Sequence, residues 1–175
     1  MKRQSLLPAA ALRMPWVSIG GTMLPATEVG GDFFDVVKLS EDVVAVAVAD
    51  VTGHGVGAGI LSAMTKSALH SQLRHDPAPV NVLRNLNATI YEVSGEKMFV
   101  TFAYVLLDRP NRTAIVATAG HPPLFRHRRE ANTVEPLRTA SLGLGMRAEA
   151  DFTSLAFSPV DSMPYVAFMD YGVNR

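Results

Sequence analysis

The stretch that most constrains the fold is Val43–Asp50, a run of valine and alanine that ends on a carboxylate. Because both faces of this stretch are apolar, it predicts a central strand that is buried on two sides. Four glycines follow Asp50, at positions 53, 55, 57 and 59. A buried strand that ends on an acid, next to backbone that can approach a ligand closely, predicts a functional site at Asp50.

A second acidic stretch lies upstream, where two glycines come directly before Asp32. Glycine-flanked aspartates at strand ends supply the carboxylate oxygens that Mg²⁺ and Mn²⁺ prefer, and pairs of such ions are used in phosphoryl chemistry. The alternative is that Asp32 and Asp50 cap turns, because both local sequences are also ordinary turn sequences. From the residues alone, both interpretations stay open.

Of two histidines and one threonine that stand out next, only His54 is a further candidate. His54 lies between two glycines, and a tight bend there brings it near Asp50 as a proton donor. A hydrogen bond from His54 to a loop carbonyl is an equally open alternative. His121 precedes two prolines and is typical of a residue that fixes a loop, and Thr101 is typical of a strand residue.

The remaining pattern predicts an α+β fold with helices packed outside antiparallel sheets. Apolar residues recur at helical spacing over 57–75 and 80–93, so two helices follow one another. Strands are expected over 17–25, 33–39, 99–107, 112–119, 124–127, 152–157 and 165–168. A tight turn over 108–111 joins two of them into a hairpin, which indicates antiparallel pairing rather than helix-linked crossovers.

Composition narrows the classes of function. The 16 basic and 16 acidic residues give a formal net charge of zero, so we expect neither nucleic acid nor a membrane as a partner. The absence of cysteine excludes disulfides, thiolate metal sites and a cysteine nucleophile. We expect a cytoplasmic protein, and the near-zero charge leaves a homodimer open.

Five motifs, in order along the chain, resemble the SpoIIE/RsbU branch of bacterial PPM-type (protein phosphatase 2C-like) serine/threonine phosphatases. They are Gln4–Pro8, Pro25–Asp35, Ala49–Ala58, Met98–Thr101 and Ala119–Pro123. The resemblance implies a four-layer α/β/β/α sandwich of two antiparallel sheets flanked by helices. It also implies a linker-like N-terminal helix over residues 1–15 and a phosphatase domain over 16–175.

The resemblance further implies how such a domain works. Water activated by two Mn²⁺ or Mg²⁺ ions would attack phosphoserine or phosphothreonine directly. Asp32 and Asp50 would be metal-bound catalytic carboxylates, with Asp50 bridging the ions, and the backbone carbonyl of Val51 would add another oxygen. The expected substrate is a phosphorylated STAS-type antagonist of an anti-sigma factor, in stress-response signalling.

The chain departs from the family pattern near its C-terminal end. The family's later metal motif, roughly Tyr-Thr-Asp-Gly, corresponds to Phe168–Val173, in which Asp170 is kept as a metal ligand. The chain ends at Arg175, so the resemblance implies that the family's last helix, strand pair and Asp-Asp motif are missing and that metal binding is weaker. The alternative functions are a catalytically impaired relative that binds a partner or dimerises, and an unrelated metal-binding α+β domain.

Overall fold

The structure is a computed structural model of the 175-residue chain, and it describes residues 11–23, 30–95, 97–158 and 165–167. In chain order these residues form β1 (Ala11–Met14), β2 (Val17–Gly20), β3 (Phe33–Lys38), β4 (Val43–Val51), α1 (Val56–Leu73), α2 (Pro79–Ser94), β5 (Val100–Asp108), β6 (Thr113–Ala119), β7 (Leu124–Arg128), β8 (Thr133–Leu137), β9 (Ser154–Phe157) and β10 (Tyr165–Ala167). The two expected helices and the strands expected around Asp50 are confirmed.

The centre of the fold is a five-stranded antiparallel sheet in the order β3-β4-β5-β6-β9. Because side chains alternate along a strand, β4 contributes to two cores. Its odd-numbered residues from 45 to 51 join the helix-side core, which includes Leu83 and Tyr104. Val44 and Val46 join the inter-sheet core, which includes Leu124 of β7 and Leu137 of β8. The predicted burial of this strand on both faces is confirmed.

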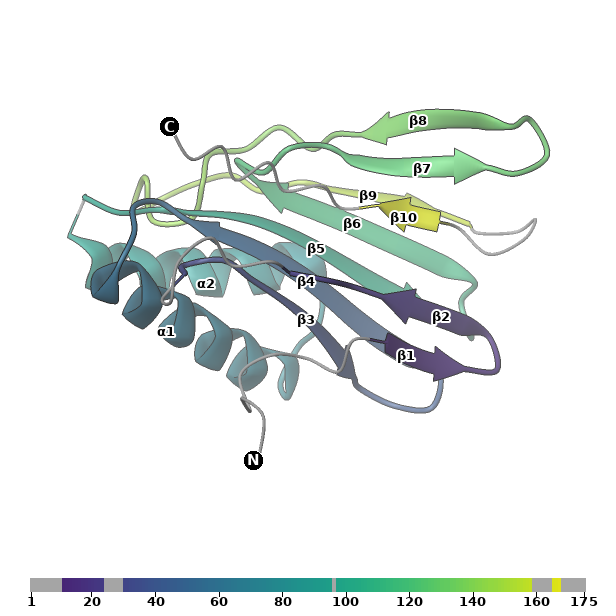
Figure 1. Ribbon diagram of the computed structural model, residues 1–175, viewed down its shortest axis with the longest axis horizontal. Helices are drawn as coiled ribbons and strands as arrows, with labels where there is room; N and C mark the ends of the chain where they lie inside the picture. Colours follow the sequence, from purple (N-terminus) through teal and green to yellow (C-terminus); the bar gives the residue numbers. More distant parts are fainter. Residues whose placement is uncertain (1–10, 24–29, 96, 159–164, 168–175) are drawn as a thin grey trace.

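The sheets and helices are arranged in layers. Figure 1 shows α1 and α2 side by side along one face of the five-stranded sheet. The β1–β2 hairpin and the sheet β10-β7-β8 lie toward the other face, where Leu12 and Ile19 pack against the inter-sheet core. The stacked sheets and their helix layer confirm the α+β sandwich. A second helix layer is not found within the part of the chain that the structure describes.

Tyr104 of β5 ties the sheet to the connection between the two helices. It is fully buried, and its hydroxyl donates a 3.0 Å hydrogen bond to the carbonyl of Pro77. Burial, and then the Asp76 carboxylate, raise the pKa of Tyr104 well above its ordinary value, so the phenol stays neutral. Asp76 accepts hydrogen bonds from the Ala78 N–H at 2.8 Å and the Asn81 amide at 2.6 Å, which together lower its pKa.

Two elements differ from the sequence predictions. Residues 11–14 form strand β1 rather than the end of a helix, because Leu12 and Met14 alternate onto the inter-sheet core; residues 1–10 of the predicted helix lie outside the described residues. Strand β8 was not predicted, because Pro136 interrupts its pattern. β8 lies at the edge of its sheet, where a proline is tolerated because one side of the strand needs no ladder hydrogen bonds.

Packing in the helix-side core predicts a large stability effect at Leu83, which has 0% exposure on α2. Leu83→Ala should lower the free energy of unfolding by about 2–5 kcal/mol, because it leaves a cavity that close-packed neighbours cannot fill. Urea denaturation followed by circular dichroism measures this. The control is Val93→Ala on the same helix, where the side chain is 46% exposed and the change should stay within about 0.5 kcal/mol.

The hydrogen bonds of Asp76 predict a pH-dependent contribution to stability. Because folding lowers its pKa, the stabilisation is present above the ordinary value of 3.8 and is lost as the pH falls below it through the folded pKa. Asp76→Ala should therefore lower the free energy of unfolding at pH 7 by about 0.5–1 kcal/mol, a small value because solvent screens a carboxylate at the surface. The difference from the unchanged chain should shrink toward zero as urea titrations are repeated from pH 5 to pH 2. A difference that persists at the lowest pH would contradict the assignment.

Candidate functional site

Three polar residues lie in one row across the ends of neighbouring strands. Asp50 of β4 is the direct antiparallel partner of Thr101 of β5. On the other side of β4, Ala49 is paired with Phe33 of β3. Continuing that register by one residue places Asp32 opposite Asp50. Asp32, Asp50 and Thr101 therefore form what we call the strand-end row.

A close backbone approach supports this register. A Cβ atom added to Gly31 would lie 2.8 Å from the Cβ of Val51 and 3.2 Å from the Val51 carbonyl oxygen. Only glycine fits this position without displacing backbone. The segment that carries Asp32 is therefore held against the end of β4, with the Val51 carbonyl beside it.

The strand-end row lies on the sheet face opposite the helices. The neighbours of Asp50 in the chain, Ala49 and Val51, both belong to the helix-side core, so alternation directs Asp50 to the inter-sheet side. Asp32, Asp50 and Thr101 are all partly buried. No hydrogen bond or ion pair of the Asp50 carboxylate is found within the described part of the chain. A half-buried carboxylate of this kind is suited to binding a cation.

The loop after β4 is shaped by two glycines with left-handed backbone, Gly53 at φ 91° and Gly55 at φ 77°. Thr52 anchors it, because its N–H and its hydroxyl each donate a 3.0 Å hydrogen bond to the Phe99 carbonyl. His54, between the two glycines, is exposed. The role of His54 beside Asp50 stays a prediction.

A polar pair at the far end of the row was missed by the sequence interpretation. The Thr101 Oγ1 and the His121 Nδ1 atoms are 2.9 Å apart, and both residues are partly buried. The signal was available in the predicted hairpin over 99–119. Antiparallel pairing of its two arms brings the start of the first arm next to the end of the second, where His121 follows.

Asp35, although close to Asp32 in sequence, serves the opposite face of the sheet. It is 5% exposed, and its Oδ2 atom lies 2.7 Å from the Nε2 of His70 and 3.3 Å from the Nζ of Lys66. Both partners belong to α1. Asp35 therefore fastens β3 to α1 and stands outside the strand-end row.

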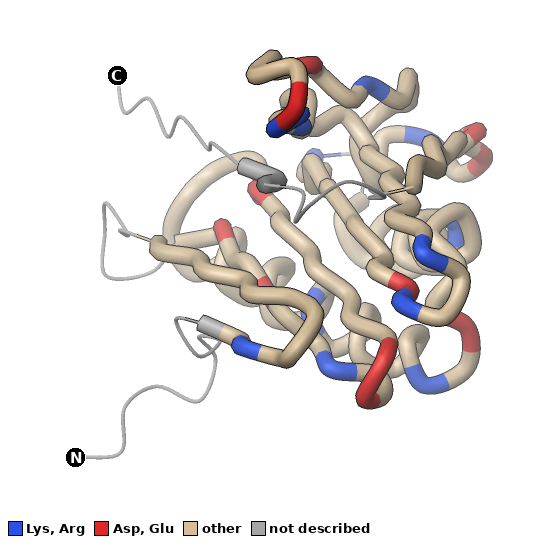
Figure 2. The backbone as a smooth tube through the Cα atoms, turned by 90° about the vertical axis from the view of Figure 1, so that its right-hand side faces the viewer, with Lys and Arg blue, Asp and Glu red and all other residues tan. Residues whose placement is uncertain are grey.

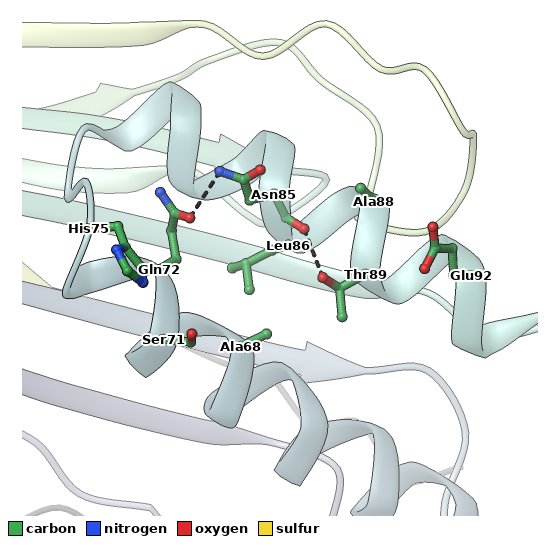
Figure 3. Close-up of a pocket in the computed structure, with 9 residues that line it drawn as sticks. All are labelled: Ala68, Ser71, Gln72, His75, Asn85, Leu86, Ala88, Thr89 and Glu92. Atoms are coloured by element: carbon green, nitrogen blue, oxygen red, sulfur yellow. Dashed lines mark hydrogen bonds between the residues drawn. The ribbon is translucent and has the colours of Figure 1, made fainter.

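A separate hollow of about 360 Å³ lies between α1 and α2. Figure 3 shows polar side chains around it, with the Asn85 amide donating a 2.9 Å hydrogen bond to Gln72 across the two helices. Its lining contains no residue of the strand-end row. The hollow is therefore a surface feature of the helix layer and is distinct from the acidic site.

The oxygen atoms of Asp32, Asp50 and the neighbouring Val51 carbonyl fit a hard divalent cation. Two carboxylates and a backbone carbonyl supply oxygen ligands, and Mg²⁺ and Mn²⁺ keep several waters in their remaining positions. No group of three or more His, Cys, Asp or Glu side chains that could hold an ion is found among the described residues. Asp170, predicted as a further ligand, lies outside those residues.

Charge is mixed over the molecule. In the view of Figure 2, Lys and Arg are interspersed with Asp and Glu, mainly in loops and at strand ends. This pattern agrees with the formal net charge of zero and shows no single-sign stripe along the elements in view. No helix in the described residues is long and apolar enough to cross a membrane.

Comparison with known proteins identifies the class of protein to which this sandwich and its strand-end row belong. The family model described as Stage II sporulation protein E (SpoIIE) matches residues 40–159. Phosphoserine phosphatase RsbU of Bacillus subtilis (strain 168) is 31% identical over 150 residues, which cover 86% of this chain and 44% of RsbU. Phosphoserine phosphatase RsbP of the same organism is 21% identical over 149 residues, covering 83% of this chain and 37% of RsbP.

A solved structure agrees with these matches. The RsbU and RsbW domains of a Mycobacterium tuberculosis protein superpose with a TM-score of 0.63 at 28% identity, covering 75% of this chain and 37% of that one. The chain belongs to the SpoIIE family, and its resemblance to the SpoIIE/RsbU branch of PPM-type phosphatases is confirmed. It spans less than half the length of the curated relatives named here.

The strand-end row predicts a measurable metal affinity. Asp50→Asn should weaken Mn²⁺ binding by about tenfold or more, because the ion loses a charged oxygen ligand. Isothermal titration calorimetry of the two proteins measures this. The matched control is Asp42→Asn, which changes a half-exposed carboxylate just before the other end of β4, where it pairs with Arg109. Equal Mn²⁺ affinity in Asp50→Asn and the unchanged chain would exclude Asp50 as a ligand.

Proposed function

We propose that this chain is the catalytic part of a metal-dependent protein serine/threonine phosphatase, which hydrolyses phosphoserine or phosphothreonine on a regulatory protein. The observation that carries the proposal is the register that sets Asp32 beside Asp50 on the inter-sheet face. Family membership supports it, as does the 31% identity to a relative that is a phosphoserine phosphatase.

In this proposal Asp32, Asp50 and the Val51 carbonyl hold Mn²⁺ or Mg²⁺, and Asp170 adds a carboxylate. When bound, such ions supply an activated water and neutralise the charge of the phosphate. The chain positions the phosphate by leaving the bends at Gly53 and Gly55 free of side chains. His54, exposed between them, is the proposed proton donor to the departing serine or threonine oxygen.

The proposed substrate is a phosphorylated STAS-type antagonist of an anti-sigma factor. The protein that binds it is proposed to be cytoplasmic and to form a homodimer. Its support is the family resemblance together with the names of the relatives. In one of them, RsbU and RsbW domains occur in a single protein. The alternative of a catalytically impaired partner-binding relative is not favoured by these comparisons, because both curated relatives named above are phosphatases.

The activity test is Mn²⁺-dependent hydrolysis of a phosphoserine peptide. The unchanged chain should release inorganic phosphate, and Asp50→Asn should lower kcat/KM by about 100-fold or more, because charge neutralisation and water activation are both lost. The control Asp42→Asn should keep the full rate. Absence of turnover at saturating Mn²⁺ in the unchanged chain would refute the proposed function.

A further inference from the structure

We propose that Thr101 and His121 form a substrate-positioning pair at this site. The Thr101 hydroxyl fixes the imidazole of His121, and the pair presents a hydrogen-bond donor to an oxygen of the phosphate ester bound beside Asp50. This inference rests on the proposed phosphatase function and names two residues that position the ester.

The position of the pair follows from the strand register. Thr101 is the direct cross-strand partner of Asp50, and side chains in such positions have Cβ atoms about 4.5–5.5 Å apart on one face of the sheet. The Thr101 hydroxyl in turn lies 2.9 Å from the Nδ1 of His121. One side chain, that of Thr101, therefore lies between the imidazole and Asp50.

The turn that carries His121 is closely packed against neighbouring backbone. Gly120 has a positive φ of 61°, and a Cβ atom there would lie 2.8 Å from the backbone nitrogen of Gly143. Gly120 also forms a bridge with Phe102, the residue next to Thr101. Close backbone packing beside a polar contact favours a pre-organised binding group.

The surrounding loop is fastened by other hydrogen bonds. The Gly120 N–H donates a 3.2 Å bond to the Ser141 carbonyl, and the Ser141 hydroxyl donates to the Thr118 carbonyl. Thr118 and Thr139 join their hydroxyls at 2.7 Å. The Thr101–His121 bond joins this loop to the strand-end row at Thr101, the cross-strand partner of Asp50, which favours a role in the site.

The pair keeps a donor in either tautomer of neutral histidine. If the Thr101 hydroxyl donates to Nδ1, the ring proton is on Nε2, and the ring can donate from there. If Nδ1–H donates to Oγ1, the Thr101 hydroxyl hydrogen is the second donor. A donor fixed beside a phosphate oxygen stabilises the charge that develops there during hydrolysis.

The test compares Thr101→Val, Thr101→Ser and His121→Ala in the full chain, with Mn²⁺ and two substrates, p-nitrophenyl phosphate and a phosphoserine peptide. Thr101→Val, which keeps the shape and loses the hydroxyl, and His121→Ala should each lower kcat/KM for the peptide by about 10- to 100-fold. Thr101→Ser should restore activity to within about threefold of the unchanged chain, because it keeps the hydroxyl. Mn²⁺ affinity by calorimetry should stay unchanged in all three.

The control is Thr89→Val, which removes a hydroxyl of matched partial burial that donates a 3.0 Å bond to Asn85 within α2, and it should keep full activity. If the unchanged chain hydrolyses neither substrate, the proposed function fails and this inference falls with it. If the unchanged chain is active and Thr101→Val matches it, only the inference is overturned. Loss in Thr101→Ser equal to that in Thr101→Val, or loss that merely follows a lowered melting temperature, would also overturn it. If His121→Ala does not fold, the two Thr101 variants decide the question.

Discussion

The antiparallel register of β4 between β3 and β5 is the constraint on which the rest of this structure depends. It sets Asp32, Asp50 and Thr101 in one row, and it places alternate residues of β4 in two different cores. A shift of one residue would turn Asp50 toward the helices and bring Ala49 and Val51 to the inter-sheet face in its place. The same pairing therefore holds the sandwich together and creates its acidic edge.

Polar contacts on the helix side keep that register from moving. Asp35 joins β3 to Lys66 and His70 of α1, and Tyr104 joins β5 to the connection between the helices. Both anchors lie on the face opposite Asp50. The site thus rests on a sheet whose other face is fastened to the helices.

Much of the fold was predictable because its signals are local. The valine-alanine run, the two amphipathic helices and the 99–119 hairpin each follow from hydrophobic period and turn residues. Strand β8 was not predicted because Pro136 interrupts its strand pattern, although proline is tolerated in an edge strand. Strand β1 was not predicted because its extended backbone is stabilised by pairing with β2, which local sequence does not indicate. In the site, Asp32 and Asp50 stood out through their glycine neighbours, whereas Thr101 had no local mark and His121 was expected only to fix a loop.

The sequence by itself determined the family, the central strand and the two acidic positions, because motif order and hydrophobic periodicity can be read directly from the sequence. Only the tertiary structure decided which face of the sheet carries Asp50, that Asp35 serves the opposite face, and that His121 is hydrogen-bonded to the cross-strand partner of Asp50. The physical reason is that these relations depend on the pairing and packing of strands far apart in the chain, such as β4 and β5, which pair Asp50 with Thr101. Pairing over that distance is determined by the packing of whole strands, so local sequence patterns do not predict it.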